Sequence, residues 1–298
     1  MLRLRQIRDL LVVLDCGSMR AAAARLGVSQ PAVTKSIRSL EAELGVELIH
    51  RTTLGVTPTR AGVAFAARAR VAQLELDRAR EEIMARRGEA DVSLSLGVAS
   101  AAMMLVATQA IVRFRQVHPL GKMHVIEGPG PTLLPLVRNG AIDAALTQRV
   151  APGEAPGLTY RPLLRTRLAV VGRKGHPLTR ARTLAELLDA EWLAFRPPKA
   201  NGALEVALKS EGMPFPSRHV QCESLALRLG LLRNSDALAL LVPQVLKDPM
   251  GASLQEIPIR RPLPEISVGM YRRTDTPASS AWNHFRGYLL RGVRELER

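Results

Sequence analysis

The stretch from Ser18 to Leu44 constrains the fold most, because it predicts two short helices joined by a tight turn. Ser18 is suited to cap the first helix. Gly27 is suited to end it, because glycine adopts the left-handed conformation without steric cost. Pro31 stands near the first position of the second helix, where a missing N–H costs nothing. Apolar residues at helical spacing predict a buried face on the second helix: Ala32, Val33, Ile37, Leu40 and Leu44.

The opposite face of the second helix carries side chains that suit contacts with DNA bases. Glutamine can bond an adenine edge through two hydrogen bonds, threonine offers a hydroxyl and a methyl group, and lysine reaches guanine acceptors or phosphate. In a helix-turn-helix the first residues of the second helix enter the major groove. Gln30, Thr34 and Lys35 are therefore predicted base contacts. The alternative is an amphipathic helix pair whose polar side is only solvated, and this stretch alone leaves both interpretations open.

The residues around the motif resemble the N-terminal domain of LysR-type transcriptional regulators over Leu2 to Gly62. The shared features are an LRQ opening, GS before the first motif helix, AAxxLxVSQPAV at the turn, LExxLGxxL after the second helix, and TxxG. The chain departs from the family's pattern in the second motif helix, at Val33 to Lys35, and in the wing, at Thr52 to Leu54. The resemblance implies a DNA-binding regulator, and the length and pattern of the remaining chain fit the same family.

A small two-stranded wing is predicted for Glu47 to Thr59, with its turn at Gly55. Arg51 in this wing is placed to reach the DNA backbone or minor groove. Ser18 and Arg20 stand at a helix start, where free N–H groups favour a phosphate. The predicted DNA contacts are Ser18, Arg20, Ser29, Gln30, Pro31, Thr34, Lys35, Arg38, Arg51 and Thr52.

From Arg60 to about Arg87 the chain is predicted to form one long helix without proline. Val63, Ala67, Val71 and Leu74 follow a heptad-like spacing, and such a stripe needs a partner. A homodimer would bury the stripe and space two recognition helices on double-stranded DNA. Packing against other helices of the same chain is the alternative. The family resemblance implies that dimers assemble into a homotetramer.

The pattern changes to alternating strands and helices from Val92 onwards. VSLSLGVA, KMHVIEG and AIDAALTQ are predicted strands separated by helices, an order that predicts a parallel sheet. A second α/β unit follows, and the strand Ile266 to Tyr271 is predicted to return to the first one. The predicted fold class is α/β, with a winged helix-turn-helix at 1–59, a linker and dimerisation helix at 60–88, and a two-lobed effector-binding domain resembling periplasmic binding proteins at 91–298. Lobe I is expected at about 91–160 and 266–298, and lobe II at about 161–265.

A ligand site is predicted between the lobes, because ligands of such sheets bind beyond the carboxyl ends of the strands. Ser100 and Thr132 follow strands at helix starts, where a hydroxyl and N–H groups suit a carboxylate or sulfonate. A role as helix caps is the alternative. The family resemblance implies a small-molecule inducer, which we expect to be a small organic acid or related anion. The predicted effector contacts are Ser100, Ala101, Ala102, Gly130, Thr132, Gln148, Arg196, Asn201, Glu223 and Ser224.

Composition narrows the partners, cofactors and cellular location that fit this chain. The net charge of +15 suits a polyanionic partner. Cys16 and Cys222 form no CxxC pattern and the six histidines are scattered, so no metal, cofactor or disulfide is expected. Buried structural thiols are the expected role of the cysteines, and redox sensing is the alternative. No run approaches the ~20 apolar residues of a membrane span, and arginines interrupt the N-terminus where a signal peptide would lie. A cytoplasmic protein without a membrane partner is expected.

The leading interpretation is a sequence-specific DNA-binding transcriptional regulator controlled by a small-molecule effector. An enzyme is not expected, because the chain contains no GxSxG, HExxH, P-loop or post-strand GxGxxG pattern. A constitutive DNA-binding protein whose lobes sense nothing is one alternative. A solute-binding protein is another, but it would need a secretion signal and would not use the Ser18 to Leu44 motif.

Overall fold

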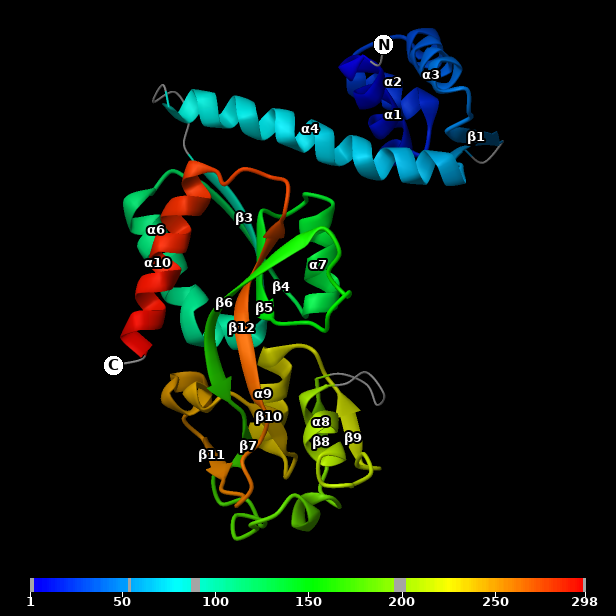
Figure 1. The fold of residues 1–298 in the computed structure, drawn as a ribbon. Helices are drawn as coiled ribbons and strands as arrows, with labels where there is room; N and C mark the ends of the chain where they lie inside the picture. The colour runs from blue at the N-terminus through cyan, green and yellow to red at the C-terminus, as the bar shows by residue number, and fades with distance from the viewer. Residues whose placement is uncertain (1–2, 53–54, 87–91, 196–201, 297–298) are drawn as a thin grey trace. The chain divides into compact units, whose positions relative to one another are not determined.

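The computed structural model describes residues 3–52, 55–86, 92–195 and 202–296 (Figure 1). The chain divides into two compact units near Asp91 and Val92. The first unit contains the predicted helix-turn-helix and long helix, and the second contains the two α/β lobes. Among the described helices none is long and apolar enough to span a membrane.

Three helices form the centre of the first unit: α1 (Leu4–Cys16), α2 (Met19–Leu26) and α3 (Gln30–Leu44). Each ends at a glycine in the left-handed conformation, and Gly27 closes α2 with φ +68°. The helices enclose an apolar core because their buried residues recur at helical spacing. The most deeply buried members of this core larger than alanine are Leu10, Val13, Val33, Ile37, Leu40 and Leu48.

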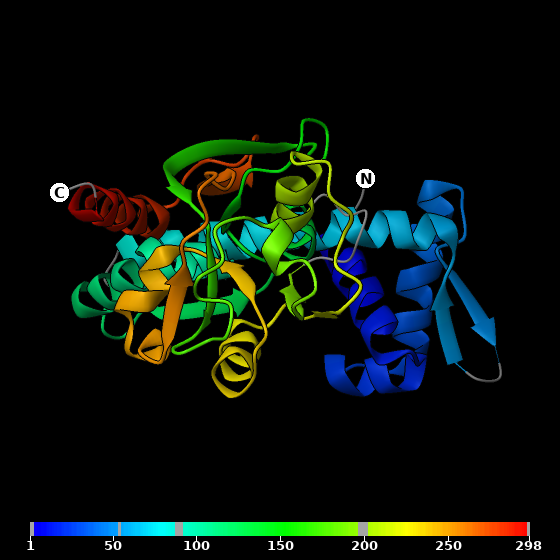
Figure 2. The ribbon, with the colours of Figure 1, turned by 90° about the horizontal axis from the view of Figure 1, so that it is seen from below.

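The predicted wing is an antiparallel hairpin of β1 (Ile49–Thr52) and β2 (Gly55–Pro58), which lie side by side in Figure 2. Ile49 and Val56 are buried and join the core of the helices. The hairpin is also attached through Gly17, whose carbonyl accepts a hydrogen bond from the Val56 amide at 2.8 Å. The wing is therefore fixed to the helices from both of its strands.

The long helix α4 spans Arg60–Arg86. Thr59 caps it, since its Oγ1 accepts a hydrogen bond from the Gly62 amide at 2.9 Å. Among the α4 residues whose side chains the structure describes, Gly62, Ala66 and Ala69 are buried, and the last two pack with Leu11 of α1. The heptad-like stripe lies elsewhere on the helix, because Val63 is 57% exposed. Packing within this unit therefore leaves part of that stripe uncovered.

Lobe I of the second unit is built on one five-stranded sheet in the order β4-β3-β5-β12-β6. Strand β3 (Ser93–Val98) runs parallel to β4 (Lys122–Glu127) and to β5 (Ala144–Gln148). Strand β12 (Glu265–Arg273) is antiparallel to both β5 and β6 (Leu158–Arg167). The parallel arrangement predicted for the first three strands is thus confirmed, and the sheet as a whole is mixed because β12 returns from lobe II in the opposite direction.

Helices cover both faces of this sheet. On one face lie α6 (Thr108–Val117) and α10 (Ser280–Leu296), packed against Leu96, Leu146 and Met270. On the other face lies α7 (Gly130–Arg138), packed against Ala145 and Tyr271 (Figure 1). Neighbouring residues of β5 and β12 enter different cores because strand side chains alternate between faces. This alternation explains the near-continuous burial of β5.

Lobe II contains a three-stranded antiparallel sheet in the order β10-β7-β11, formed by Ala239–Leu241, Ala169–Arg173 and Leu254–Ile257. A parallel pair of β8 (Trp192–Ala194) and β9 (His219–Gln221) adjoins it through a bridge from Trp192 to Leu238. The helices of this lobe are α8 (Ala203–Lys209) and α9 (Leu225–Asn234). Between β7 and β8 the chain forms a short 3₁₀ turn, Ala185–Leu187.

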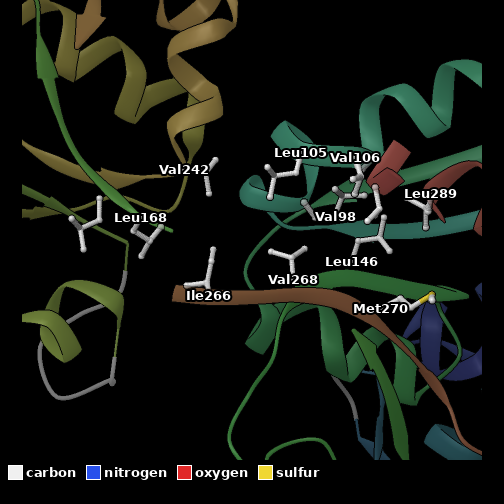
Figure 3. Close-up of a cluster of buried hydrophobic side chains, with 14 of the residues drawn as sticks. Val98, Leu105, Val106, Leu146, Leu168, Val242, Ile266, Val268, Met270 and Leu289 are labelled. Atoms are coloured by element: carbon white, nitrogen blue, oxygen red, sulfur yellow. The ribbon is translucent and has the colours of Figure 1, made fainter. Parts of the chain in front are cut away.

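Two segments connect the lobes, one after β6 and one before β12. The predicted start of lobe II at about 161 is wrong, because β6 pairs with β12 in the lobe I sheet as far as Arg167. The crossing therefore falls at Leu168. Figure 3 shows Leu168, Val242 and Ile266 in the same apolar cluster as Leu146 and Leu289 of lobe I. The two lobes thus share one continuous core beside their crossings.

Candidate functional site

The turn between α2 and α3 is shaped by backbone hydrogen bonds. The Gly27 amide donates to the carbonyls of Ala23 and Ala24, and the Val28 amide donates to the Ala23 carbonyl at 3.1 Å. These bonds satisfy carbonyls that the end of a helix leaves free, and they require the left-handed glycine. Ser18 caps α2 as predicted, accepting from the Ala21 amide at 3.4 Å. Ser29 makes no such side-chain bond at the start of α3.

Helix α3 presents a polar face to solvent and an apolar face to the core. Val33, Ile37 and Leu40 are buried and Leu44 is half-buried. Ala32 is exposed, so its assignment to the buried face is wrong: it lies about 100° around the helix from Val33. The predicted base contacts occupy the outer side, where Gln30, Lys35 and Arg38 are exposed and Thr34 is half-buried, with Pro31 exposed beside them.

Two side-chain hydrogen bonds hold α3 against α1. Ser36 Oγ donates to Asp9 Oδ2 at 2.6 Å, and Gln6 Nε2 donates to Ser39 Oγ at 2.9 Å. Asp9 and Gln6 are 4% and 9% exposed, so both bonds are largely shielded from water. Buried polar groups that keep their partners fix orientation, because any displacement leaves a group unsatisfied. These bonds set the angle at which α3 presents its polar face.

We expect Ser36→Ala to lower the free energy of unfolding of the first unit by about 2 kcal/mol, because Asp9 then keeps a buried carboxyl group without its donor. Ser39→Ala removes the bond to a neutral amide and is expected to cost about 1 kcal/mol. Chemical denaturation of both variants measures the difference. Equal stability of the Ser36→Ala variant and the wild type would contradict this role for the bond.

The other predicted DNA contacts surround α3 or lie in the wing. Arg20 at the start of α2 and Arg51 on β1 are exposed, and neither forms an ion pair within residues 3–52 and 55–86. The same holds for Lys35 and Arg38 of α3. Thr52 Oγ1 donates to the Gly55 carbonyl at 3.3 Å, so this hydroxyl already serves the hairpin. Thr53 and Leu54 lie outside the described residues. Four cations without acidic partners thus border one exposed helix face or its wing.

The second candidate site is a cavity of about 270 Å³ within the second unit. On the lobe I side it lies at the carboxyl ends of β3, β4 and β5, which is where parallel α/β sheets bind ligands. On the lobe II side it meets the ends of β8 and β10 and the starts of α8 and α9. Leu168 and Ile266, at the two crossings, also line it. Movement of one lobe against the other would therefore change its shape.

Four predicted effector contacts line this cavity: Ser100, Ala101, Gly130 and Gln148. Ser100 begins a continuous helical run to Val117, which includes a π-helical turn at Met103–Ala107. Such turns occur frequently at functional sites. Met104, within this turn, also lines the cavity. The binding roles of the four residues remain predictions.

Four other predicted contacts do not line the cavity. Ala102 is fully buried in the lobe core. Thr132 is exposed, because α7 begins at Gly130 rather than at Thr132, and two further residues turn the side chain by about 200°. Glu223 and Ser224 are exposed, and Ser224 Oγ caps α9 by accepting from the Leu227 amide at 3.3 Å. Arg196 and Asn201 lie outside the described residues.

Sequence reasoning missed several polar residues that line the cavity. Thr147 is buried, and its neighbour Arg149 lies with its guanidinium carbon 5.6 Å from the centre of the Tyr160 ring. The next residue, Val150, donates its amide to the Tyr271 hydroxyl at 2.9 Å, which holds this loop in place. Burial raises the pKa of Tyr271, so the phenol stays neutral at physiological pH.

The most consequential missed residue is Arg228 on α9, which lines the cavity while only 4% exposed. The only indication of a buried arginine in the sequence was a single charged residue in the apolar run LALRLGLL. A charged residue among leucines that share its helix face is expected to be buried, and a buried charge calls for a partner. The sequence does not reveal which groups would surround it.

Comparisons with known proteins agree with this architecture. A family model described as the LysR substrate binding domain matches residues 87–294, and one described as a bacterial regulatory helix-turn-helix protein of the lysR family matches residues 4–63. The transcriptional regulator TdcA of Escherichia coli K12 is 29% identical over 257 residues, which cover 85% of this chain and 81% of TdcA.

Two solved structures have similar folds. The chain of full-length CbnR complexed with its target DNA gives a TM-score of 0.68 at 22% identity, covering 98% of this chain and 100% of CbnR. ArgP from Mycobacterium tuberculosis gives a TM-score of 0.74 at 18% identity, covering 98% of both chains.

Proposed function

The chain belongs to the LysR family of transcriptional regulators, and we propose that α3 reads its operator while a small molecule between the lobes controls that binding. In this proposal Gln30, Thr34 and Lys35 contact base edges in the major groove, and Arg20 and Arg51 contact phosphate. The proposal depends on one observation, that the same chain contains two features. One is the exposed helix α3 with cations beside it, and the other is a cavity at the crossings between two lobes. CbnR, which has a similar fold, has been solved with its target DNA.

Control by the small molecule requires a difference in its affinity for two arrangements of the lobes. A ligand that binds both arrangements equally shifts neither, however tightly it binds. Two segments connect the lobes, and Leu168 and Ile266 within them line the cavity. We propose that effector contacts with both lobes favour one arrangement and thereby alter DNA binding.

We propose that the working form is a homodimer that assembles into a homotetramer. The support for a dimer is the heptad-like stripe of α4, on which Val63 is 57% exposed. A second copy of the helix would remove this side chain from water. Because its proposed partners are DNA and an effector, we assign the protein to the cytoplasm and ascribe no catalytic activity to it.

The test begins with selection of bound duplexes from a random-sequence library by the full-length protein. The enriched duplex is then titrated with protein at several salt concentrations, with and without each compound of a metabolite panel. We expect one sequence to be enriched and one compound to change its affinity. Enrichment without any effect of a compound that binds the protein would favour a constitutive DNA-binding protein.

Ser100 and Thr132 offer a matched pair for testing the effector site. For a compound that raises the melting temperature, we expect Ser100→Ala to weaken binding about 3- to 10-fold, the effect of losing one hydrogen bond. Thr132→Ala is expected to leave binding unchanged, because Thr132 is not among the residues that line the cavity. Calorimetric titration of each variant measures the affinities. If Thr132→Ala weakened binding and Ser100→Ala did not, the effector would bind outside this cavity.

A further inference from the structure

Arg228 is a buried cation at the wall of the cavity, and its contacts are incomplete. Nη2 donates to the Leu240 carbonyl at 2.9 Å, and the guanidinium carbon lies 5.6 Å from the centre of the Phe195 ring. Nε is buried and has no hydrogen-bond partner. No aspartate or glutamate in the described part of the chain forms an ion pair with Arg228. Within the described residues, the Nε–H of Arg228 is thus a donor that no protein group uses.

Such an arrangement is costly unless an anion completes it. A charge removed from water loses its hydration, and one carbonyl and one aromatic ring restore only part of it. Burial lowers the pKa of Arg228 to about 10, so the side chain stays protonated at neutral pH. The side chain therefore keeps its positive charge in a mostly apolar environment.

The other charges that line the cavity do not neutralise Arg228. Glu205 is buried, at 6% exposure, but its carboxylate oxygen Oε1 forms an ion pair with Lys209 Nζ at 2.8 Å. Arg149 and Glu154 are both exposed. The lobe II residues that line the cavity with Arg228 include the apolar Leu193, Phe215, Leu225 and Val242.

We propose that Arg228 binds the carboxylate of the effector, and that the effector is a small monocarboxylic acid with an apolar body. This inference rests on the proposed function, since it names the chemistry of the same site. Guanidinium and carboxylate fit through two parallel N–H···O bonds, and one of these would use the Nε donor that the described protein groups leave free.

The experiment uses the full-length protein and defined probes. Straight-chain monocarboxylates of two to eight carbons and benzoate are each paired with the corresponding neutral primary amide, and inorganic phosphate serves as a non-carboxylate anion. Thermal unfolding is followed at constant ionic strength for the wild type, Arg228→Met and Arg233→Met. Arg233 is the matched control, because it is an exposed arginine on the same helix and does not line the cavity.

We expect at least one carboxylate to raise the melting temperature of the wild type while its amide and phosphate do not. In Arg228→Met the affinity for that carboxylate should fall about 100-fold, the effect of losing a charge-assisted bidentate contact. Arg233→Met should bind like the wild type. A carboxylate shift that persists in Arg228→Met, or no shift with any carboxylate, would overturn the proposal.

The melting temperature without any probe gives an independent readout. If the charge of Arg228 is compensated only when a ligand binds, the Arg228→Met variant without ligand should melt at or above the wild-type temperature. Methionine at this position removes an uncompensated buried charge. A clear drop would indicate a structural role for its contacts with Leu240 and Phe195 and would overturn the proposal. If a neutral compound instead binds and changes DNA affinity, the proposed function stands and the carboxylate assignment fails.

Discussion

Replacing Gly62 with alanine should destabilise the first unit by about 3 kcal/mol or more and abolish DNA binding. A Cβ atom at this position would lie 1.9 Å from the carbonyl oxygen of Leu48 and 2.9 Å from its carbonyl carbon. Both are backbone atoms, so the contact cannot be relieved by a side-chain rotation. Gly62 belongs to the TxxG pattern that follows the wing, and the structure shows why this helix needs a glycine there.

The backbone of Leu48 cannot move away from an added Cβ atom, because its own hydrogen bonds fix its position. Its amide donates to Glu41 Oε1 at 2.8 Å, and its carbonyl accepts from the Thr59 amide at 2.9 Å. Its side chain is 1% exposed in the core beneath α3. An alanine at position 62 must therefore separate α4 from the wing or displace Leu48 from the core. Either change disturbs the support of the recognition helix.

Gly287→Ala provides the matched control for this prediction. Gly287 also lies within a helix, α10, and a Cβ atom there would meet nothing within 4 Å. Alanine should stabilise that helix by about 0.5–1 kcal/mol through its higher helix propensity. Calorimetry reports the stability of each variant, and hydrogen exchange locates the change. Wild-type protection of α1 to α3 in the Gly62→Ala variant would show that the first unit accommodates the added methyl group.

Lys35→Glu should reduce affinity for the selected duplex about 100-fold or more, while the fold remains intact. Lys35 is exposed on the outer face of α3 and forms no ion pair within the described first unit, so the substitution breaks no internal contact. It replaces a cation with an anion at a surface predicted to face DNA, and a dimer would contain the change twice. One lost base contact costs about 1–3 kcal/mol, and the repulsion adds to it.

Salt dependence distinguishes the two roles that Lys35 can have. If Lys35 contacts phosphate, Lys35→Ala should reduce the slope of log affinity against log salt by about 1 for each bound copy. If it contacts a base, the variant should instead bind a wider range of sequences. Lys247→Glu, an equal charge change on an exposed residue of the second unit, serves as control. Equal losses of DNA affinity in the Lys247→Glu and Lys35→Glu variants would show that the effect comes from the overall charge of the protein and not from a contact made by Lys35.

The sequence by itself determined the elements that local chemistry specifies. Ser18 and Gly27 bound α2, and Val33, Ile37 and Leu40 face the core, because caps and helical spacing act over only a few residues. The order of strands and helices predicted two lobes with a ligand site at the strand ends. It also predicted that Ile266 to Tyr271 returns to lobe I, and β12 confirms this.

Only the tertiary structure decided which side chains meet at the cavity. Arg228 and Ser100 line it from different lobes, and no local pattern links residues so far apart in the chain. The predictions for Thr132 and the lobe boundary failed for a related reason. A shift of two residues in a helix start turns a side chain by about 200°, and the pairing of β6 depends on β12, about a hundred residues later. Long-range packing sets both, so the sequence predicted the kind of site, and the fold selected its residues.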